Sequence, residues 1–295
     1  MPKALQITLL VPGILLFVLL FGMFPVVLQT DHFEGALSFN WSGGFSTIAE
    51  YMKGMWSGQS FQYLSGKTEH SFWDQIGSSF SVTFFYITVG GLIGATLGVL
   101  LGVYFGISRI KWLKRILELT AVMPDFVIVL LLQFLIVFIA TETGYVIFDV
   151  ASFSTDDPAI ALPLISTIII PANYMIRNVA LHMSNTLTED YINFAKARGL
   201  SKRYIIFYHA LPNVLPFVKA DLHKFMGILF GNLFIFEYLF NLGGVTMFVF
   251  SNAFAFDGYQ YSLVVNGILT LLLLYAIVYS LLRLVIFGAE KVIIR

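Results

Sequence analysis

Six long apolar stretches constrain this chain more than any other feature of its sequence. They lie near residues 5–29, 78–107, 116–140, 158–181, 214–240 and 262–288. A membrane-spanning helix needs about 20 predominantly apolar residues, because hydrocarbon offers no partner to an irregular backbone. The run from Leu5 to Leu28 exceeds the roughly 7–15 residues of a signal-peptide core, and no small-residue cleavage pattern follows it. The pattern predicts an all-α integral membrane protein with about six transmembrane helices, the first of them retained.

Composition agrees with a membrane location. Only 12% of the residues are charged, about half of the roughly 25% that is usual in soluble domains. The 17 basic and 17 acidic residues cancel to a net charge of zero, which removes any argument for nucleic-acid binding from overall charge. The chain has no cysteine, so disulfides, thiolate nucleophiles and Cys-ligated zinc are excluded.

The distribution of Lys and Arg predicts the orientation in the bilayer. With a cytoplasmic N-terminus, only Lys53 and Lys67 fall outside, which leaves 15 of the 17 basic residues on the cytoplasmic side. Cytoplasmic loops of membrane proteins carry such an excess of positive charge. We therefore expect both termini to be cytoplasmic.

The connections between the stretches differ in length and predict the domain organisation. We expect a first transmembrane helix over residues 1–30, an outer loop or small cap over residues 31–77, and a five-helix core over residues 78–295. The outer segment contains Trp41, Trp56 and Trp73 and is too aromatic for a disordered linker.

The longest cytoplasmic connection, residues 182–213, carries helix signals, and we call it the inner segment. Thr186 with Glu189 has the spacing of a capping box, Gly199 suits a helix end, and Ser201 can cap a second helix. These signals predict a pair of cytoplasmic helices within residues 186–212, joined by a sharp turn.

The first helix of the inner segment is expected to carry an apolar ridge. Tyr191, Phe194, Ala195 and Ala197 form this ridge, and basic residues flank it. Such a ridge suits docking into a groove of a soluble partner. An interfacial helix lying on anionic lipid has the same pattern, and the residues alone do not separate the two.

The second apolar stretch has glycine at every fourth position, at Gly90, Gly94, Gly98, Gly102 and Gly106. Four residues turn a helix by about 400°, so these positions form a slowly precessing stripe. A stripe without side chains lets another helix approach closely. It indicates either helix packing or a place along a transport path.

Motifs for catalysis are missing. Gly66-Lys67-Thr68 resembles the end of a phosphate-binding loop, but position 61 is Phe where that loop needs Gly. The sequence has no zinc-protease motif and no nucleophile elbow, and its five histidines are scattered. We expect neither an enzyme nor a metal site.

Ionisable residues within the apolar stretches remain as candidates for a translocation path or gate, because charge in hydrocarbon is costly. They are Glu237, Asp125 and Arg177. Glu237 is alternatively a helix-end group that reaches water or an amide, and Arg177 alternatively extends toward the cytoplasm.

The run Glu189–Ser201, followed by His209–Asn213, resembles the coupling loop of permease subunits in binding-protein-dependent ABC importers, E-A-A-x3-G-x9-I-x-L-P. The amino acids within this segment are similar to those of the oligopeptide, dipeptide and nickel branch of the family. Asn193 and Phe194 stand where the pattern has Glu and Ala, and His209 replaces its Ile. The resemblance implies these ATPase-coupling residues: Glu189, Asp190, Tyr191, Phe194, Ala195, Ala197, Arg198, Gly199, Leu200, Leu211 and Pro212.

This resemblance implies a multi-pass permease of the type I ABC importer kind in a bacterial or archaeal cytoplasmic membrane. The implied partners are a second, similar permease subunit forming a heterodimer, two cytoplasmic ATPases and an outer substrate-binding protein. ATP and Mg²⁺ would bind the ATPases, and this chain would hold no cofactor. The implied substrates are small peptides, with nickel or a metal chelate as the alternative within the branch. A self-sufficient secondary carrier is the rival from another class.

Overall fold

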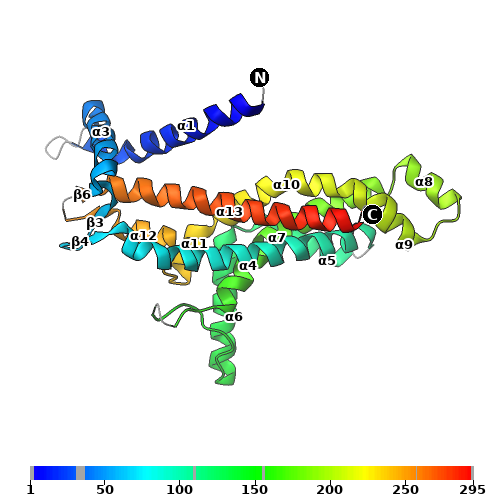
Figure 1. Cartoon of the computed structure of the whole chain (residues 1–295). Helices are drawn as coiled ribbons and strands as arrows, with labels where there is room; N and C mark the ends of the chain where they lie inside the picture. Colours follow the sequence, from blue (N-terminus) through cyan, green and yellow to red (C-terminus); the bar gives the residue numbers. More distant parts are fainter. Residues whose placement is uncertain (1–2, 31–36, 109–110, 155–156, 257, 294–295) are drawn as a thin grey trace. The chain divides into compact units, whose positions relative to one another are not determined.

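The computed structural model describes residues 3–30, 37–108, 111–154, 157–256 and 258–293 (Figure 1). Residues 31–36 of the expected outer cap, and the first two and last two residues of the chain, lie outside this description. The chain forms two compact units. Unit 1 comprises Met1–Ser81 with Gly243–Leu274, and unit 2 comprises Val82–Leu242 with Tyr275–Arg295.

The described residues of unit 1 form helices and three short antiparallel strand pairs. Its elements are α1 (Lys3–Gly22), α2 (Phe24–Val27), β1 (Leu28–Thr30), β2 (Leu37–Phe39), α3 (Trp41–Ser57), the 3₁₀ turn η1 (Gln59–Phe61), β3 (Gln62–Ser65), β4 (Thr68–Ser71), α12 (Val245–Asn252), β5 (Phe254–Ala255) and β6 (Gly258–Tyr259). Strand β1 pairs with β2, β3 with β4, and β5 with β6.

The regular secondary structure of the described residues of unit 2 is helical. The elements of this unit are α5 (Lys111–Val122), α6 (Asp125–Thr143), α7 (Ala161–Thr186), α8 (Asp190–Ala197), α9 (Lys202–Tyr204), the π-helical turn η2 (Ile205–Ala210), α10 (Leu211–Gly231) and α11 (Leu233–Leu239). A non-helical connection lies between α6 and α7. Two long helices, α4 (Phe72–Ile107) and α13 (Tyr261–Ile293), have residues in both units.

Five stretches of the described chain are helical, long enough and apolar enough to cross a membrane. They are Leu10–Val27, Phe72–Ile107, Asp125–Thr143, Ala161–Thr186 and Tyr261–Lys291. Each overlaps one of the apolar stretches expected from the sequence. The expected all-α membrane architecture is confirmed.

The third expected stretch, residues 116–140, is divided into two helices. α5 ends at Val122 and α6 begins at Asp125, with Pro124 between them in an extended conformation (φ −58°, ψ 139°). Proline has no N–H to donate, and it disfavours the helical conformation of the residue before it. The membrane-crossing helix therefore starts nine residues later than the hydrophobic pattern predicted.

The fifth expected stretch, residues 214–240, is also interrupted. α10 ends at Gly231 and α11 starts at Leu233, with Asn232 between them. α10 carries three charged residues, and α7 and α13 provide partners for two of them. Lys219 forms an ion pair with Glu290, and Asp221 accepts a hydrogen bond from the Tyr174 hydroxyl at 3.4 Å.

The outer segment packs around tyrosines rather than around its tryptophans. The Tyr51 hydroxyl donates to Asn266 Oδ1 at 2.8 Å, and Tyr51 belongs to a buried cluster with Val27 and Val265. Trp56, by contrast, is 94% exposed. Asn40 caps α3 by accepting a hydrogen bond from the Gly43 N–H at 2.9 Å.

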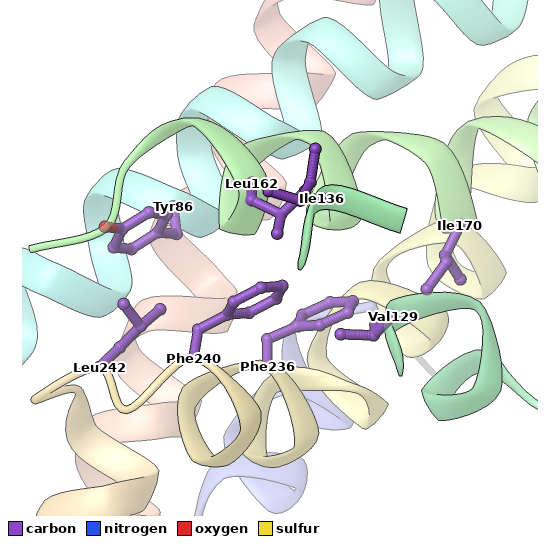
Figure 2. Close-up of a cluster of buried hydrophobic side chains, with 8 residues drawn as sticks. All are labelled: Tyr86, Val129, Ile136, Leu162, Ile170, Phe236, Phe240 and Leu242. Atoms are coloured by element: carbon purple, nitrogen blue, oxygen red, sulfur yellow. The ribbon is translucent and has the colours of Figure 1, made fainter. Parts of the chain in front are cut away.

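The core of unit 2 gathers aromatic and aliphatic side chains from α6, α7 and the α11 region. Figure 2 shows the rings of Phe236 and Phe240 pointing toward Leu162, Ile136 and Val129. Both rings are almost fully buried. Because lipid tails are as apolar as these side chains, the cluster holds α11 against α6 and α7 through van der Waals packing and not through removal of apolar surface from water.

The glycine stripe of α4 faces α7. A Cβ atom added to Gly98, Gly102 or Gly106 would lie 2.6 Å from a Cβ atom of α7, in each case of a residue four positions further along that helix. These α7 residues are Met175, Val179 and Met183. The stripe thus serves the close packing of two helices, the small-residue mode of membrane interfaces.

Candidate functional site

The inner segment connects α7 to α10 through two short helices (Figure 1). The expected capping box is absent, and that prediction is wrong. Thr186 is the last residue of α7 and is buried, while Glu189 occupies the N-cap of α8 without a side-chain hydrogen bond. Because α7 continues through Thr186, the Thr186 backbone is helical and does not take the extended conformation that a capping residue needs.

The turn after α8 is set by Gly199. Its φ is +78°, and the Leu200 N–H donates to the Ala195 carbonyl at 3.3 Å while the Gly199 N–H donates to the Lys196 carbonyl at 2.9 Å. This pair of bonds is the Schellman motif, in which glycine is favoured because it lacks a Cβ atom. Ser201 then caps α9 by accepting from the Tyr204 N–H at 3.3 Å, so the predicted sharp turn between two helices is present.

Helix α8 has one buried and one exposed face. Ile192 is fully buried and Ala195 is buried beside it, whereas Phe194 is 65% exposed. The expected ridge therefore included one residue, Ala195, that faces inward, and it omitted Ile192. Positions three apart lie on the same face of a helix, which explains why Ile192 and Ala195 share the packed side.

The exposed face of α8 combines aromatic and cationic groups. The Arg198 guanidinium lies 5.9 Å from the centre of the Phe194 ring, and the Tyr191 ring is partly exposed beside them. Partial burial raises the pKa of Tyr191, as does the Glu189 carboxylate, and a hydrogen bond with Asn213 opposes them. The Tyr191 hydroxyl is therefore protonated at neutral pH, and the face has no negative charge from this residue.

A π-helical turn, η2, follows α9 and was not anticipated from the sequence. It precedes Leu211 and Pro212, which begin α10. Pro212 has no N–H to donate into the preceding turn, and that missing donor was the available signal. Ile205 and Ile206 of η2 are buried, and α8 packs against this turn, so α8 is joined to α10 through a packed, irregular link.

A polar cavity of about 150 Å³ lies between α5, α6, α7 and α10. Asp125 and Arg177, both expected to lie on a translocation path, line this cavity. Thr120, Asn173 and Tyr174 add polar groups to its wall. The structure thus brings together two of the three ionisable residues that were predicted from the sequence.

Glu237 does not line the polar cavity. It is 1% exposed, and the Thr83 hydroxyl donates to its Oε1 at 2.6 Å. Its backbone carbonyl accepts from the Leu242 N–H at 2.8 Å. Glu237 is a buried, hydrogen-bonded residue near the end of α11. Its position near a helix end is as the structural alternative expected, but it is closed to water, and the partner at Oε1 is a hydroxyl.

Two residues of the cavity region were missed in the sequence. Asn232 donates to Asp125 Oδ2 at 2.7 Å, and Asn173 donates to Thr120 Oγ1 at 2.6 Å. Each is an amide in an apolar stretch, which was the available signal. Within the described residues, no group of three or more His, Asp or Glu side chains could hold a metal ion.

Helices long and apolar enough to cross a membrane, packed around a small polar cavity and continued by a pair of short helices, are features that suit a membrane component of a transport system. Residues 94–293 match the family model described as binding-protein-dependent transport system inner membrane component. The chain belongs to this family.

Among curated relatives, the chain is 32% identical over 174 residues to the oligopeptide transport system permease protein OppB of Mycoplasma genitalium, which covers 56% of this chain and 42% of that protein. It is 30% identical over 137 residues to the di/tripeptide transport system permease protein DppB of Pseudomonas aeruginosa, covering 44% of this chain and 40% of the relative. The chain thus matches less than half the length of these relatives.

The inward-facing MetNI methionine ABC transporter has a similar fold, with a TM-score of 0.51. The similarity covers 76% of this chain and 98% of that chain at 16% identity. The expected fold, that of a type I ABC importer permease, is confirmed.

Proposed function

We propose that this chain is the transmembrane permease subunit of an ABC importer that moves small peptides across the cytoplasmic membrane. The exposed aromatic and cationic face of α8 is the observation that carries this proposal. The peptide assignment is supported by the relatives, whose names describe oligopeptide and di/tripeptide permeases.

In this proposal, the α8 face docks into a groove of a cytoplasmic ATPase. Phe194 is the anchor, because a large, exposed aromatic ring on a short helix buries much apolar area when a partner covers it. Arg198 and the partly exposed Tyr191 form the rim. The complex contains two ATPases, a second permease subunit and an outer binding protein, and ATP with Mg²⁺ binds the ATPases.

Motion of the ATPases reaches the membrane through the buried face of α8. Ile192 and Ala195 pack inward, and α8 contacts η2, which leads directly into α10. A displaced α8 therefore moves η2 and α10 with it. Nucleotide shifts the population of inward-open and outward-open states only by its differential affinity for them.

The test is substitution of the anchor. Phe194→Ala removes the apolar contact while Ile192 and Ala195 keep α8 packed, so ATPase co-purification and ATP-driven peptide uptake should both fall by about tenfold, for a contact of roughly 1.4 kcal/mol or more. Phe138→Ala is the matched control, because Phe138 is 51% exposed on α6, outside the inner segment. Normal co-purification of the Phe194→Ala protein would refute the docking face.

A further inference from the structure

The polar cavity contains three groups whose hydrogen-bonding capacity is unused within the described part of the chain. The Arg177 guanidinium has no hydrogen bond or ion pair there, and Asp125 uses only Oδ2, which accepts from Asn232. Asn173 is 9% exposed, and its Oδ1 is buried without a partner. Buried polar atoms are usually paired, so Asn173 Oδ1 indicates a polar occupant, and the partly buried Asp125 and the exposed Arg177 are the charged groups that line the same cavity.

The orientation of the Asn173 amide follows from its neighbours. The Thr120 hydroxyl donates its single proton to backbone carbonyls of its own helix, those of Ile116 and Leu117 at 3.1 Å. Thr120 Oγ1 can therefore only accept from Asn173, which must present Nδ2 to it at 2.6 Å. The unpaired atom of Asn173 is then an acceptor.

The charges around the cavity select the chemistry of the occupant. A bare cation would be attracted by Asp125 and Asn173 Oδ1 but repelled by Arg177. A bare anion would be attracted by Arg177 but repelled by the two oxygen-bearing groups. A ligand with an ammonium group next to a carbonyl or carboxylate satisfies all three groups. The ammonium donates to Asp125 Oδ1 and Asn173 Oδ1, and the adjacent oxygen accepts from Arg177.

The volume limits how much of a peptide can enter. A cavity of about 150 Å³ accommodates a ligand of roughly the size of benzene. The ammonium, Cα atom, carbonyl group and small side chain of one amino-terminal residue have this size, whereas a whole tripeptide does not.

We propose that this cavity binds the free amino terminus of the transported peptide, with Asp125 and Asn173 holding the ammonium and Arg177 the first carbonyl. This inference rests on the proposed function and adds the substrate class: small peptides with an unmodified amino terminus. Selection in the membrane then supplements selection by the outer binding protein.

The test measures binding with the binding protein left out. The intact membrane complex in lipid nanodiscs, free of nucleotide, is titrated with trialanine and with N-acetyl-trialanine, and dissociation constants are obtained by ligand-observed NMR. We expect the wild type to bind trialanine about tenfold more tightly than N-acetyl-trialanine, because acetylation removes the charged donor. Asp125→Asn should weaken the binding of trialanine by about tenfold and leave the dissociation constant of N-acetyl-trialanine unchanged.

Asp125→Asn is suitable because its side-chain oxygen can still accept from Asn232, so the local structure is retained. Glu142→Gln on the same helix is the matched control, since Glu142 is exposed and does not line the cavity; it should leave both constants unchanged. Arg177→Gln should weaken the binding of both peptides, because both keep the first carbonyl. Arg177→Lys should restore part of the affinity for each.

Equal binding of the two peptides by the wild type would overturn the inference. So would an Asp125→Asn variant in which the ratio of the two dissociation constants is the same as in the wild type. Failure of the wild type to bind trialanine would overturn it as well. These readings are independent of transport. ATP-driven trialanine uptake by the complete wild-type transporter, together with an unchanged ratio, would refute the cavity site alone, whereas absence of uptake would refute the proposed function.

Discussion

Gly199 shows how a single residue sets the direction of the inner segment. Its φ of +78° belongs to the left-handed region, and no atom lies within 4 Å of a Cβ atom built on it. Space is therefore available for a side chain, and only the backbone conformation favours glycine. The two hydrogen bonds of the Schellman motif depend on that conformation.

We expect Gly199→Val to abolish ATP-driven trialanine uptake while the protein remains in the membrane. A left-handed conformation costs a residue with a Cβ atom roughly 1–2 kcal/mol, and β-branched residues tolerate it worst, so the turn would reopen and α8 would be displaced. Gly199→Asn is the matched control and should keep much of the uptake, because Asn visits this region more readily. Uptake assays with immunoblots of membrane fractions measure both effects. Full activity of the valine variant would show that the turn does not position α8.

Glu237 and Asp125 illustrate how residues of one chemical class acquire different surroundings. Both are carboxylic acids in apolar stretches. Glu237 is enclosed by protein and accepts from the Thr83 hydroxyl, whereas Asp125 lines a cavity. A carboxylic acid in an apolar stretch is recognised from the sequence as a charge that is costly to bury. Only the packing around it shows which groups offset that cost.

Among the helices, the packing of α4 on α7 is governed by the absence of side chains. The stripe from Gly90 to Gly106 follows α7 for four turns, and the sequence interval of four is a helical period. Because these contacts repeat at every turn, the two helices pack closely along this whole stretch.

Gly102→Ala should destabilise the protein by about 1–3 kcal/mol, the usual effect of overpacking. The new Cβ atom would lie 2.6 Å from the Cβ atom of Val179 and 3.0 Å from the Ile176 carbonyl oxygen, and backbone atoms cannot easily give way. Thermal unfolding in detergent, followed by tryptophan fluorescence, measures the change. Gly77→Ala is the matched control on the same helix, because no atom lies within 4 Å of its added Cβ atom. A loss of stability at Gly77 equal to that at Gly102 would argue against close packing as the cause.

For the whole molecule, the proposed division of labour places the energy source outside this chain. The sequence lacks a complete phosphate-binding loop. An importer permease moves its substrate only when ATP binding in its partners biases its two states.

The purified chain alone in liposomes should therefore take up no trialanine under a proton or sodium gradient. The complex with its ATPases and binding protein should take it up when ATP is supplied on the side of the inner segment. Radiolabelled uptake with and without ionophores separates the two energy sources. Gradient-driven uptake by the isolated chain would instead identify a secondary carrier and refute the importer assignment.

Much of the architecture could be predicted from the sequence because its determinants are local. Apolar length selects membrane-crossing helices, and the glycine at position 199 selects a turn through its own backbone freedom. The interruption at Pro124 is equally local, but the span predicted over residues 116–140 ran across it, because average hydropathy does not register a missing N–H.

Tertiary structure alone decided which residues meet. Thr120, Asp125, Asn173 and Arg177 are spread over more than 50 positions and three helices, and their shared cavity depends on how those helices pack. The inward face of α8 likewise depends on the neighbour that covers Ile192. Helix formation is determined by the chain's own hydrogen bonds and side-chain polarity, whereas a site requires contacts between distant segments, which no local pattern encodes.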